Sequence, residues 1–157
     1  MPLIGYARVS TEDQTPLPQS QALKSAGCVE IHEEQASGGN RARPVLARVL
    51  ERIGKGDITV VQATPTLWSM LLEAGLVPRA GLRMLAGGEP LPLDLARRLT
   101  ADGGELWNMY GPTETTIWSA AHRIGADATR ITIGHPIANT QLHVLDPLDQ
   151  LVPPGVA

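Results

Sequence analysis

Two short segments of the sequence carry residue types that could do chemistry. In the first, Arg8 and Ser10 close the run LIGYARVS, and the two-residue period of a β-strand puts their side chains on the same side. A hydroxyl beside a guanidinium suits nucleophilic attack on an anionic centre, because the positive charge supports the negative charge that develops. A second interpretation stays open on spacing alone, in which Ser10 caps a helix and Arg8 is a surface charge.

The second segment is NMYGPTE, residues 108–114. It follows an expected strand at its C-terminal end, where parallel sheets place ligand sites. Its aromatic ring, amide, hydroxyl and carboxylate could stack on a base, bond to the edge of the base, contact a phosphate and hold a divalent cation. The alternative interpretation is a Gly-Pro turn surrounded by surface residues.

The elements that must position these segments alternate between strands and helices. Hydrophobic periodicity and the helix start and stop signals predict helices over 19–26, 44–53, 64–74 and 92–101, and strands over 3–9, 29–33, 58–61, 82–85 and 105–109. This alternation predicts an α/β fold, a flavodoxin-like parallel sheet with helices on both faces. Short apolar runs separated by Gly and Pro predict a C-terminal β extension, with strands at 117–118, 131–133, 142–144 and 151–152.

Composition excludes several classes of protein. A single Cys excludes a disulfide scaffold, and no apolar run approaches the roughly 18 residues of a membrane span. The net charge of -3 argues against binding nucleic acid by bulk charge. The N-terminus lacks the pattern of a signal peptide, so we expect a cytoplasmic protein without a membrane partner. The Trp residues and most Pro residues lie after residue 57, which predicts a boundary there.

The first segment belongs to a longer pattern: YARVSTEDQ (6–14), ALKSAGC (22–28), ASG (36–38), RP (43–44) and GD (56–57). Residues 2–57 thereby resemble the catalytic domain of the resolvase/invertase family of serine recombinases. The resemblance implies that Ser10 attacks a DNA phosphodiester and forms a phosphoserine link without a metal or other cofactor. It also implies that Arg8 and Arg43 stabilise the phosphoryl transition state, and that Gln14 and Ser37 lie in the same site.

This resemblance is incomplete. The family follows its third strand with an Asp-Arg-x-x-Arg segment, whereas here Val60-Val61 is followed by QATPTLW. Its long dimerisation helix and C-terminal helix-turn-helix also have no counterpart. Phosphoryl transfer depends on positioned positive charge. The resemblance implies DNA as a partner, but because these parts are missing we expect no complete recombinase activity.

The second segment also belongs to a longer pattern: TVVQATPTLWSMLLEAG, LRMLAGGEPLP, ELWNMYGPTETTIWS and IGHPIANTQLHVLD. Residues 58–157 resemble the adenylation domains of nonribosomal peptide synthetases, in the AMP-binding, adenylate-forming superfamily. The resemblance implies that Tyr110 stacks on adenine, Asn108 meets its edge, Thr113 contacts the α-phosphate and Glu114 binds Mg²⁺. The residues implied to line the nucleotide side are Gly87, Gly88 and Glu89. Those implied for the amino-acid pocket are Gln62, Leu85, Gly87, Met109, Ile117 and Trp118.

Parts of this family are missing as well. The sequence shows no Ser/Thr/Gly-rich phosphate loop, no Asp for the substrate amino group, and no C-terminal subdomain with its catalytic Lys. Without these groups nothing stabilises the charge as pyrophosphate leaves. ATP, Mg²⁺ and an amino acid are thus the implied ligands, and we expect no tight nucleotide binding.

Both patterns meet in a strand that either family could supply, so we expect segments 1–57 and 58–157 to share one fused sheet. The sequence predicts a fusion of an incomplete serine recombinase segment with an incomplete adenylation segment, without complete activity alone. Two alternatives remain: a recombinase-like, DNA-cleaving segment that acts with a partner, and a weak adenine-nucleotide binding module. The pattern leaves the oligomeric state open.

Overall fold

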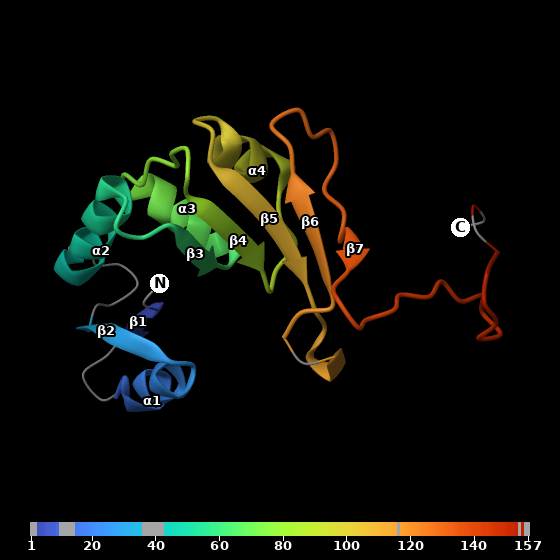
Figure 1. Ribbon diagram of the computed structural model, residues 1–157, viewed down its shortest axis with the longest axis horizontal. Coiled ribbons are helices and arrows are strands. Elements are labelled where there is room, and N and C mark those ends of the chain that lie inside the picture. Colours follow the sequence, from blue (N-terminus) through green and yellow to red (C-terminus); the bar gives the residue numbers. More distant parts are fainter. Residues whose placement is uncertain (1–2, 10–14, 36–42, 116, 154, 156–157) are drawn as a thin grey trace. The chain divides into compact units, whose positions relative to one another are not determined.

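The computed structural model describes residues 3–9, 15–35, 43–115, 117–153 and 155 (Figure 1). The chain divides into two compact units, Met1–Asp57 and Ile58–Ala157, which are described separately below. No helix within the described residues is long and apolar enough to cross a membrane.

The first unit contains two strands and two helices in alternation. Their order is β1 (Leu3–Val9), α1 (Leu17–Ser25), β2 (Cys28–Gln35) and α2 (Pro44–Lys55). β1 and β2 form a parallel pair, in register from Ile4 opposite Glu30 to Val9 opposite Gln35. Helix α2 begins at Pro44, whose fixed φ suits a first helical position, and ends at Gly56 with a left-handed φ of 92°.

The core of the first unit is small. Among the residues of this unit that the structure describes, the buried apolar side chains are Ala7, Val9, Leu46 and Ile53. Gly5 lets helix α1 approach β1, because a Cβ at this position would lie 2.8 Å from a methyl carbon of Leu23. With so little apolar burial, this unit depends to a larger extent on polar contacts.

The second unit contains one mixed sheet with the strand order β3-β4-β5-β6-β7 (Figure 1). Its elements are β3 (Val60–Ala63), α3 (Pro65–Glu73), β4 (Arg83–Gly87), α4 (Leu93–Thr100), β5 (Glu105–Tyr110), the 3-10 helix η1 (Thr113–Thr115), β6 (Ala120–Ile124) and β7 (His135–Pro136). β3, β4 and β5 are parallel, as βαβ crossovers require, and β6 and β7 add antiparallel strands.

Large apolar side chains form the core of the second unit. Trp68 of α3 is fully buried, and its indole N–H donates to the Leu85 carbonyl at 3.1 Å. Met84 of β4, Leu106 of β5 and Leu99 of α4 are also fully buried. The alternation of side chains along β4 and β5 places Met84, Ala86, Leu106 and Asn108 among the buried residues.

The α/β class is confirmed, with parallel strands and four α-helices among the described residues. Within the units, β1 pairs with β2, and β3 to β7 pair with one another. β3 has only four residues, each paired with a residue of β4. The sheet expected to be shared by segments 1–57 and 58–157 stays a prediction.

The expected strand at Ile117-Trp118 is wrong. Ile117 has a φ of 66°, which a β-branched residue rarely adopts and which is incompatible with a strand. The chain instead makes a tight loop: the Ser119 N–H donates to the Tyr110 carbonyl at 2.7 Å, and strand β6 begins at Ala120. The segments 131–133 and 142–144 are not strands either, and residues 151–152 make only one bridge, between Leu145 and Leu151.

Candidate functional site

A cavity of about 500 Å³ opens in the second unit, where β4 and β5 end. This volume lies within the usual range of small-molecule sites, roughly 300–1,000 Å³. Five residues that the sequence singled out line it: Gly88, Glu89, Asn108, Met109 and Tyr110. They meet because β4 and β5 are parallel and in register, with Gly87 opposite Met109, so both strands deliver their C-terminal residues to one edge.

Asn108 and Tyr110 bring the polar and aromatic groups to this cavity. Asn108 is 8% exposed, and its amide nitrogen donates to the Thr132 carbonyl at 2.8 Å. Tyr110, at the end of β5, is 40% exposed, so much of its ring is open to a ligand. An open aromatic face beside a held amide can stack on a planar base and bond to its edge.

Glu89 follows β4 and holds the start of helix α3. Its carboxylate accepts hydrogen bonds from the Thr66 hydroxyl at 2.6 Å and from the Thr66 backbone N–H at 3.0 Å. These hydrogen bonds lower the pKa of Glu89. The carboxylate therefore stays ionised, and it caps α3 as well as lining the cavity.

Thr113 and Glu114 lie in the 3-10 helix η1, after the cavity residues of β5. Both side chains are exposed, and neither is among the residues that line the cavity. The loop that carries them is compact: a Cβ on Gly111 would collide with the Ile117 carbonyl, and the hydroxyls of Thr115 and Ser119 are hydrogen-bonded. Thr113 and Glu114 therefore lie on a constrained loop that follows the cavity residues of β5 in the chain.

The six residues expected for an amino-acid pocket are only partly brought together. The ring of Trp118 packs on Gly87, where a Cβ would collide with the ring and would lie 2.7 Å from the Met109 carbonyl oxygen. Gln62 and Leu85 are paired across β3 and β4. Ile117, in contrast, is 69% exposed. Of these residues only Met109 lines the cavity, so the structure brings together Gly87, Met109 and Trp118 but leaves Ile117 outside.

The first unit holds two of the five residues expected for phosphoryl transfer within its described part. Gln19 fixes the backbone of Arg8: its side-chain oxygen accepts from the Arg8 N–H at 3.1 Å, and its amide donates to the Arg8 carbonyl at 2.9 Å. Arg43 occupies the N-cap position of α2, without a side-chain capping hydrogen bond. Ser10, Gln14 and Ser37 lie outside the described residues.

The charges of Arg8 and Arg43 both act on the Tyr6 hydroxyl. Burial, followed by the hydrogen bond to Glu34, raises the pKa of Tyr6, while the charges of Arg43 and Arg8 act in the opposite direction. The Glu34 carboxylate is 5% exposed and accepts from the Tyr6 hydroxyl at 2.5 Å and from the Val45 N–H at 2.9 Å. Both guanidiniums therefore act on one region of the unit, next to the Glu34 side chain.

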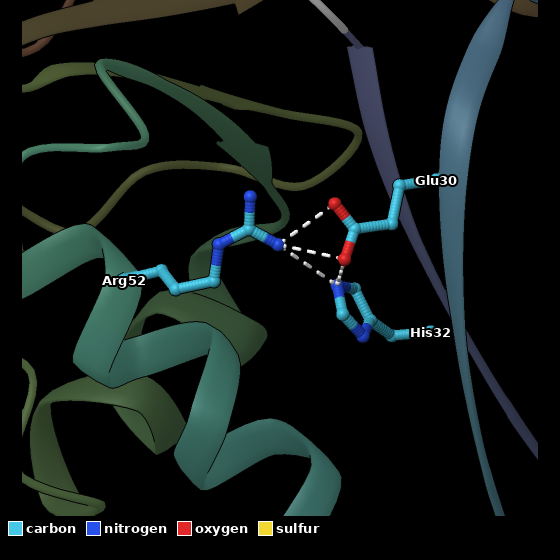
Figure 2. Close-up of polar contacts among 3 residues, drawn as sticks. All are labelled: Glu30, His32 and Arg52. Atoms are coloured by element: carbon cyan, nitrogen blue, oxygen red, sulfur yellow. Dashed lines mark hydrogen bonds and ion pairs between the residues drawn. The ribbon is translucent and has the colours of Figure 1, made fainter.

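A third cluster in the first unit belongs to neither motif. Figure 2 shows Arg52 of α2 facing Glu30 and His32 of β2. One guanidinium nitrogen of Arg52 lies 2.8 Å from each carboxylate oxygen of Glu30, and the His32 ring lies 3.0 Å from Glu30. The hydrogen bond from Arg52 lowers the pKa of Glu30. The cluster ties α2 to β2 at the surface, where such ion pairs stabilise little.

Sequence reasoning missed one wall of the cavity. The segment Ile131, Thr132 and Ile133 lines it, as do Pro90, Leu91 and Gly111. Residues 131–133 appeared as a strand in the sequence because their β-branched apolar pattern is typical of one. A usable signal was the glycine that follows, Gly134, because a Cβ at this position would collide with the Ala121 carbonyl of β6.

Comparison with known proteins identifies two families along the chain. Residues 36–157 match the model of the AMP-binding enzyme family, and residues 3–66 match the resolvase N-terminal domain. A dimodular nonribosomal peptide synthase of Bacillus subtilis (strain 168) is 46% identical over 117 residues, which are 74% of this chain and 5% of the synthase. A serine recombinase of Escherichia phage Mu is 52% identical over 59 residues, 38% of this chain and 31% of that protein.

A solved structure agrees with the first of these matches. A four-domain nonribosomal peptide synthetase, crystallised with AMP and glycine, is 39% identical and has a TM-score of 0.67. The match covers 99% of this chain and 11% of the synthetase. The chain thus spans only a small part of each relative.

Proposed function

The chain belongs to the AMP-binding enzyme family and carries a resolvase-like N-terminal segment. From this premise we propose that the second unit binds an adenine nucleotide. In this proposal the chain is a fusion of an incomplete recombinase segment, residues 1–57, with an incomplete adenylation segment, residues 58–157. By themselves these 157 residues complete neither parental reaction.

One observation carries the nucleotide proposal: the cavity gathers Asn108, Tyr110, Gly88 and Glu89 from the ends of two parallel strands. Tyr110 stacks on adenine, Asn108 bonds to the edge of the base, and Gly87, Gly88 and Glu89 line the nucleotide side. Thr113 contacts the α-phosphate. Binding is weak because the residues that stabilise the β- and γ-phosphates in the family have no counterpart in this sequence.

Mg²⁺ fits this site only together with a nucleotide. Among the described residues, no three His, Cys, Asp or Glu side chains gather into a cation site. Mg²⁺ is commonly held by one or two carboxylates plus substrate phosphates. The exposed Glu114 carboxylate supplies one such ligand, and the metal would neutralise phosphate charge there.

The amino-acid side of the site is small. Trp118 packs directly on Gly87, next to the Met109 carbonyl, so little space is left for a side chain. Gln62 and Leu85, paired across β3 and β4, belong to the same proposed pocket, whereas the exposed Ile117 does not reach it. An amino acid bound there would be a small one.

The N-terminal segment supports a second candidate function. Arg8 and Arg43 carry positive charge that acts on Tyr6, and positioned positive charge is one part of what phosphoryl transfer needs. In this candidate Ser10 is the nucleophile, Gln14 and Ser37 assist, and a partner supplies the missing arginines and the DNA-binding domain.

Calorimetry tests the nucleotide proposal. ATP with Mg²⁺ is titrated into the protein, and amino-acid-dependent pyrophosphate exchange is measured in the same preparation. We expect binding in the high micromolar to millimolar range and no exchange. No heat at millimolar ATP would contradict nucleotide binding, and measurable exchange would contradict the incomplete activity.

The recombinase candidate needs a separate assay. DNA that carries invertase recombination sites is incubated with the protein and a cell extract, then analysed for a covalent protein–DNA adduct on a denaturing gel. The matched control is Ser10→Ala. An adduct that is lost in this variant would support the candidate, and the absence of any adduct would refute it.

A further inference from the structure

The wall of the cavity that sequence reasoning missed is held by a histidine outside both motifs. The His122 ring nitrogen Nδ1 lies 2.8 Å from the Thr132 hydroxyl oxygen, and His122 pairs with Asn108 across β5 and β6. Thr132 is therefore held from two neighbouring strands: its carbonyl by Asn108 and its hydroxyl by His122.

The backbone around Thr132 confirms that this segment lies directly on β6. Gly134 has a φ of 79°, and a Cβ there would collide with the Ala121 carbonyl and lie 2.6 Å from the Cβ of His122. Strand β7 then pairs His135 with Ala121. The segment 131–133 thus enters β7 with little freedom to move away from His122.

This arrangement decides which end of the Asn108 amide is available to a ligand. A backbone carbonyl only accepts hydrogen bonds, so the amide atom that faces the Thr132 carbonyl must be the nitrogen. The amide oxygen is then the end that can accept a hydrogen bond from a ligand in the cavity. An oxygen in this position favours a base with an exocyclic amino group over a base with a carbonyl at the same place.

We propose that His122 is a positioning residue: through the Thr132 hydroxyl it holds the 131–133 wall against Asn108 and thereby fixes the orientation of the Asn108 amide in the cavity. This inference rests on the proposed nucleotide site for its ligand. The hydrogen bonds of Thr132 with His122 and Asn108 involve only residues of the second unit and form without a ligand.

Two measurements on the whole chain test the proposal. The first is the ratio of the affinities for ATP and inosine triphosphate, with Mg²⁺, because the two nucleotides differ at the purine position where ATP has an amino group and the other a carbonyl. The second is the rate of trypsin cleavage after Arg130, an exposed residue next to the wall, without ligand. Cleavage after Arg98 in α4 reports general unfolding in the same digest.

The variants separate positioning from mere stability. His122→Phe replaces the imidazole with a phenyl ring, which has no nitrogen to bond Thr132. His122→Asn places an amide atom near the position of Nδ1. His143→Phe is the matched control, because His143 lies in the exposed segment after β7 and bonds only weakly to Gln141, at 3.3 Å.

We expect a preference for ATP of about tenfold in the parent chain, falling to about twofold in His122→Phe. Cleavage after Arg130 should become about fivefold faster in His122→Phe, with cleavage after Arg98 unchanged, and both properties should return in His122→Asn. An unchanged nucleotide preference in His122→Phe would overturn the proposal. If the parent chain binds neither nucleotide, the proposed function fails, and the cleavage rate after Arg130 alone decides whether His122 holds the wall.

Discussion

The two units use their buried polar groups in different ways. In the first unit the Glu34 carboxylate is taken up by Tyr6 and by the start of α2, and the Ser20 hydroxyl donates to Glu33 at 2.5 Å. In the second unit the buried Asn108 lines the cavity, and its amide nitrogen donates to the Thr132 carbonyl in the cavity wall. Polar groups hold the first unit together, whereas in the second unit some are free to meet a ligand.

This difference follows from the size of the two cores. The second unit buries Trp68, Leu82, Met84, Leu99 and Leu106 completely, and burial of such large apolar side chains stabilises a fold. Within its described residues the first unit has four buried apolar side chains, two of them on α2. A unit with a small core needs its polar groups for stability, so fewer remain for binding.

The largest effect is expected from Trp68→Ala in the second unit. The substitution removes a fully buried indole and its hydrogen bond, which should lower the free energy of unfolding by about 4 kcal/mol. Urea unfolding followed by the emission of Trp107 and Trp118 measures this loss, with the half-buried Trp107→Phe as control. Amide exchange in β1 and β2 should not change; faster exchange there would show that the two units unfold together.

Glu34→Ala should have the next largest effect, confined to the first unit. It leaves the Tyr6 hydroxyl and the N–H groups of Val45 and Leu46 without their acceptor, at a cost of about 3 kcal/mol. Far-UV circular dichroism should show a lower melting midpoint for part of the signal, while tryptophan emission, which arises only from the second unit, stays constant. The control is Glu51→Ala, which breaks only an exposed pair with Lys55 and should leave the melting midpoint almost unchanged.

Tyr110→Ala should weaken ATP binding without a comparable loss of stability. The ring is 40% exposed, so its removal costs little core packing, but stacking on a base contributes about 1–3 kcal/mol. Calorimetry should show an affinity lower by about fivefold to 150-fold, and Tyr110→Phe should retain the parent affinity. Equal binding by Tyr110→Ala and the parent chain would place the nucleotide elsewhere.

The smallest effect is expected from acid titration of Glu89. Its pKa is lowered in the folded protein by hydrogen bonds from Thr66, so the ionised form stabilises the fold above the ordinary carboxyl pKa. This stabilisation is lost as the pH falls below about 4.5 and through the lowered value. Melting midpoints between pH 6 and pH 3 should fall less steeply in Glu89→Gln than in the parent chain. Glu73→Gln, on the exposed end of α3, is the control and should follow the parent curve.

Local patterns in the sequence were sufficient for most elements. Pro44 and Gly56 mark the two ends of α2, and the apolar period between them predicts its buried face. The residues NMY end β5 because a strand followed by Gly-Pro has a defined stop. These features depend on neighbours within a few residues, so a linear pattern contains them.

The sequence by itself determined the two family patterns, the order of strands and helices, and the group of Asn108, Tyr110 and Glu89 as candidates for a nucleotide site. Only the tertiary structure decided that β6 and β7 extend the parallel β3–β5 sheet as antiparallel strands, that Ile117 adopts a left-handed conformation, and that Thr132 lines the cavity. Asn108 and Thr132 are 24 residues apart, and their hydrogen bond depends on how β5, β6 and the chain before β7 pack. Such contacts arise from the pairing of distant backbone segments, which no local period in a sequence encodes.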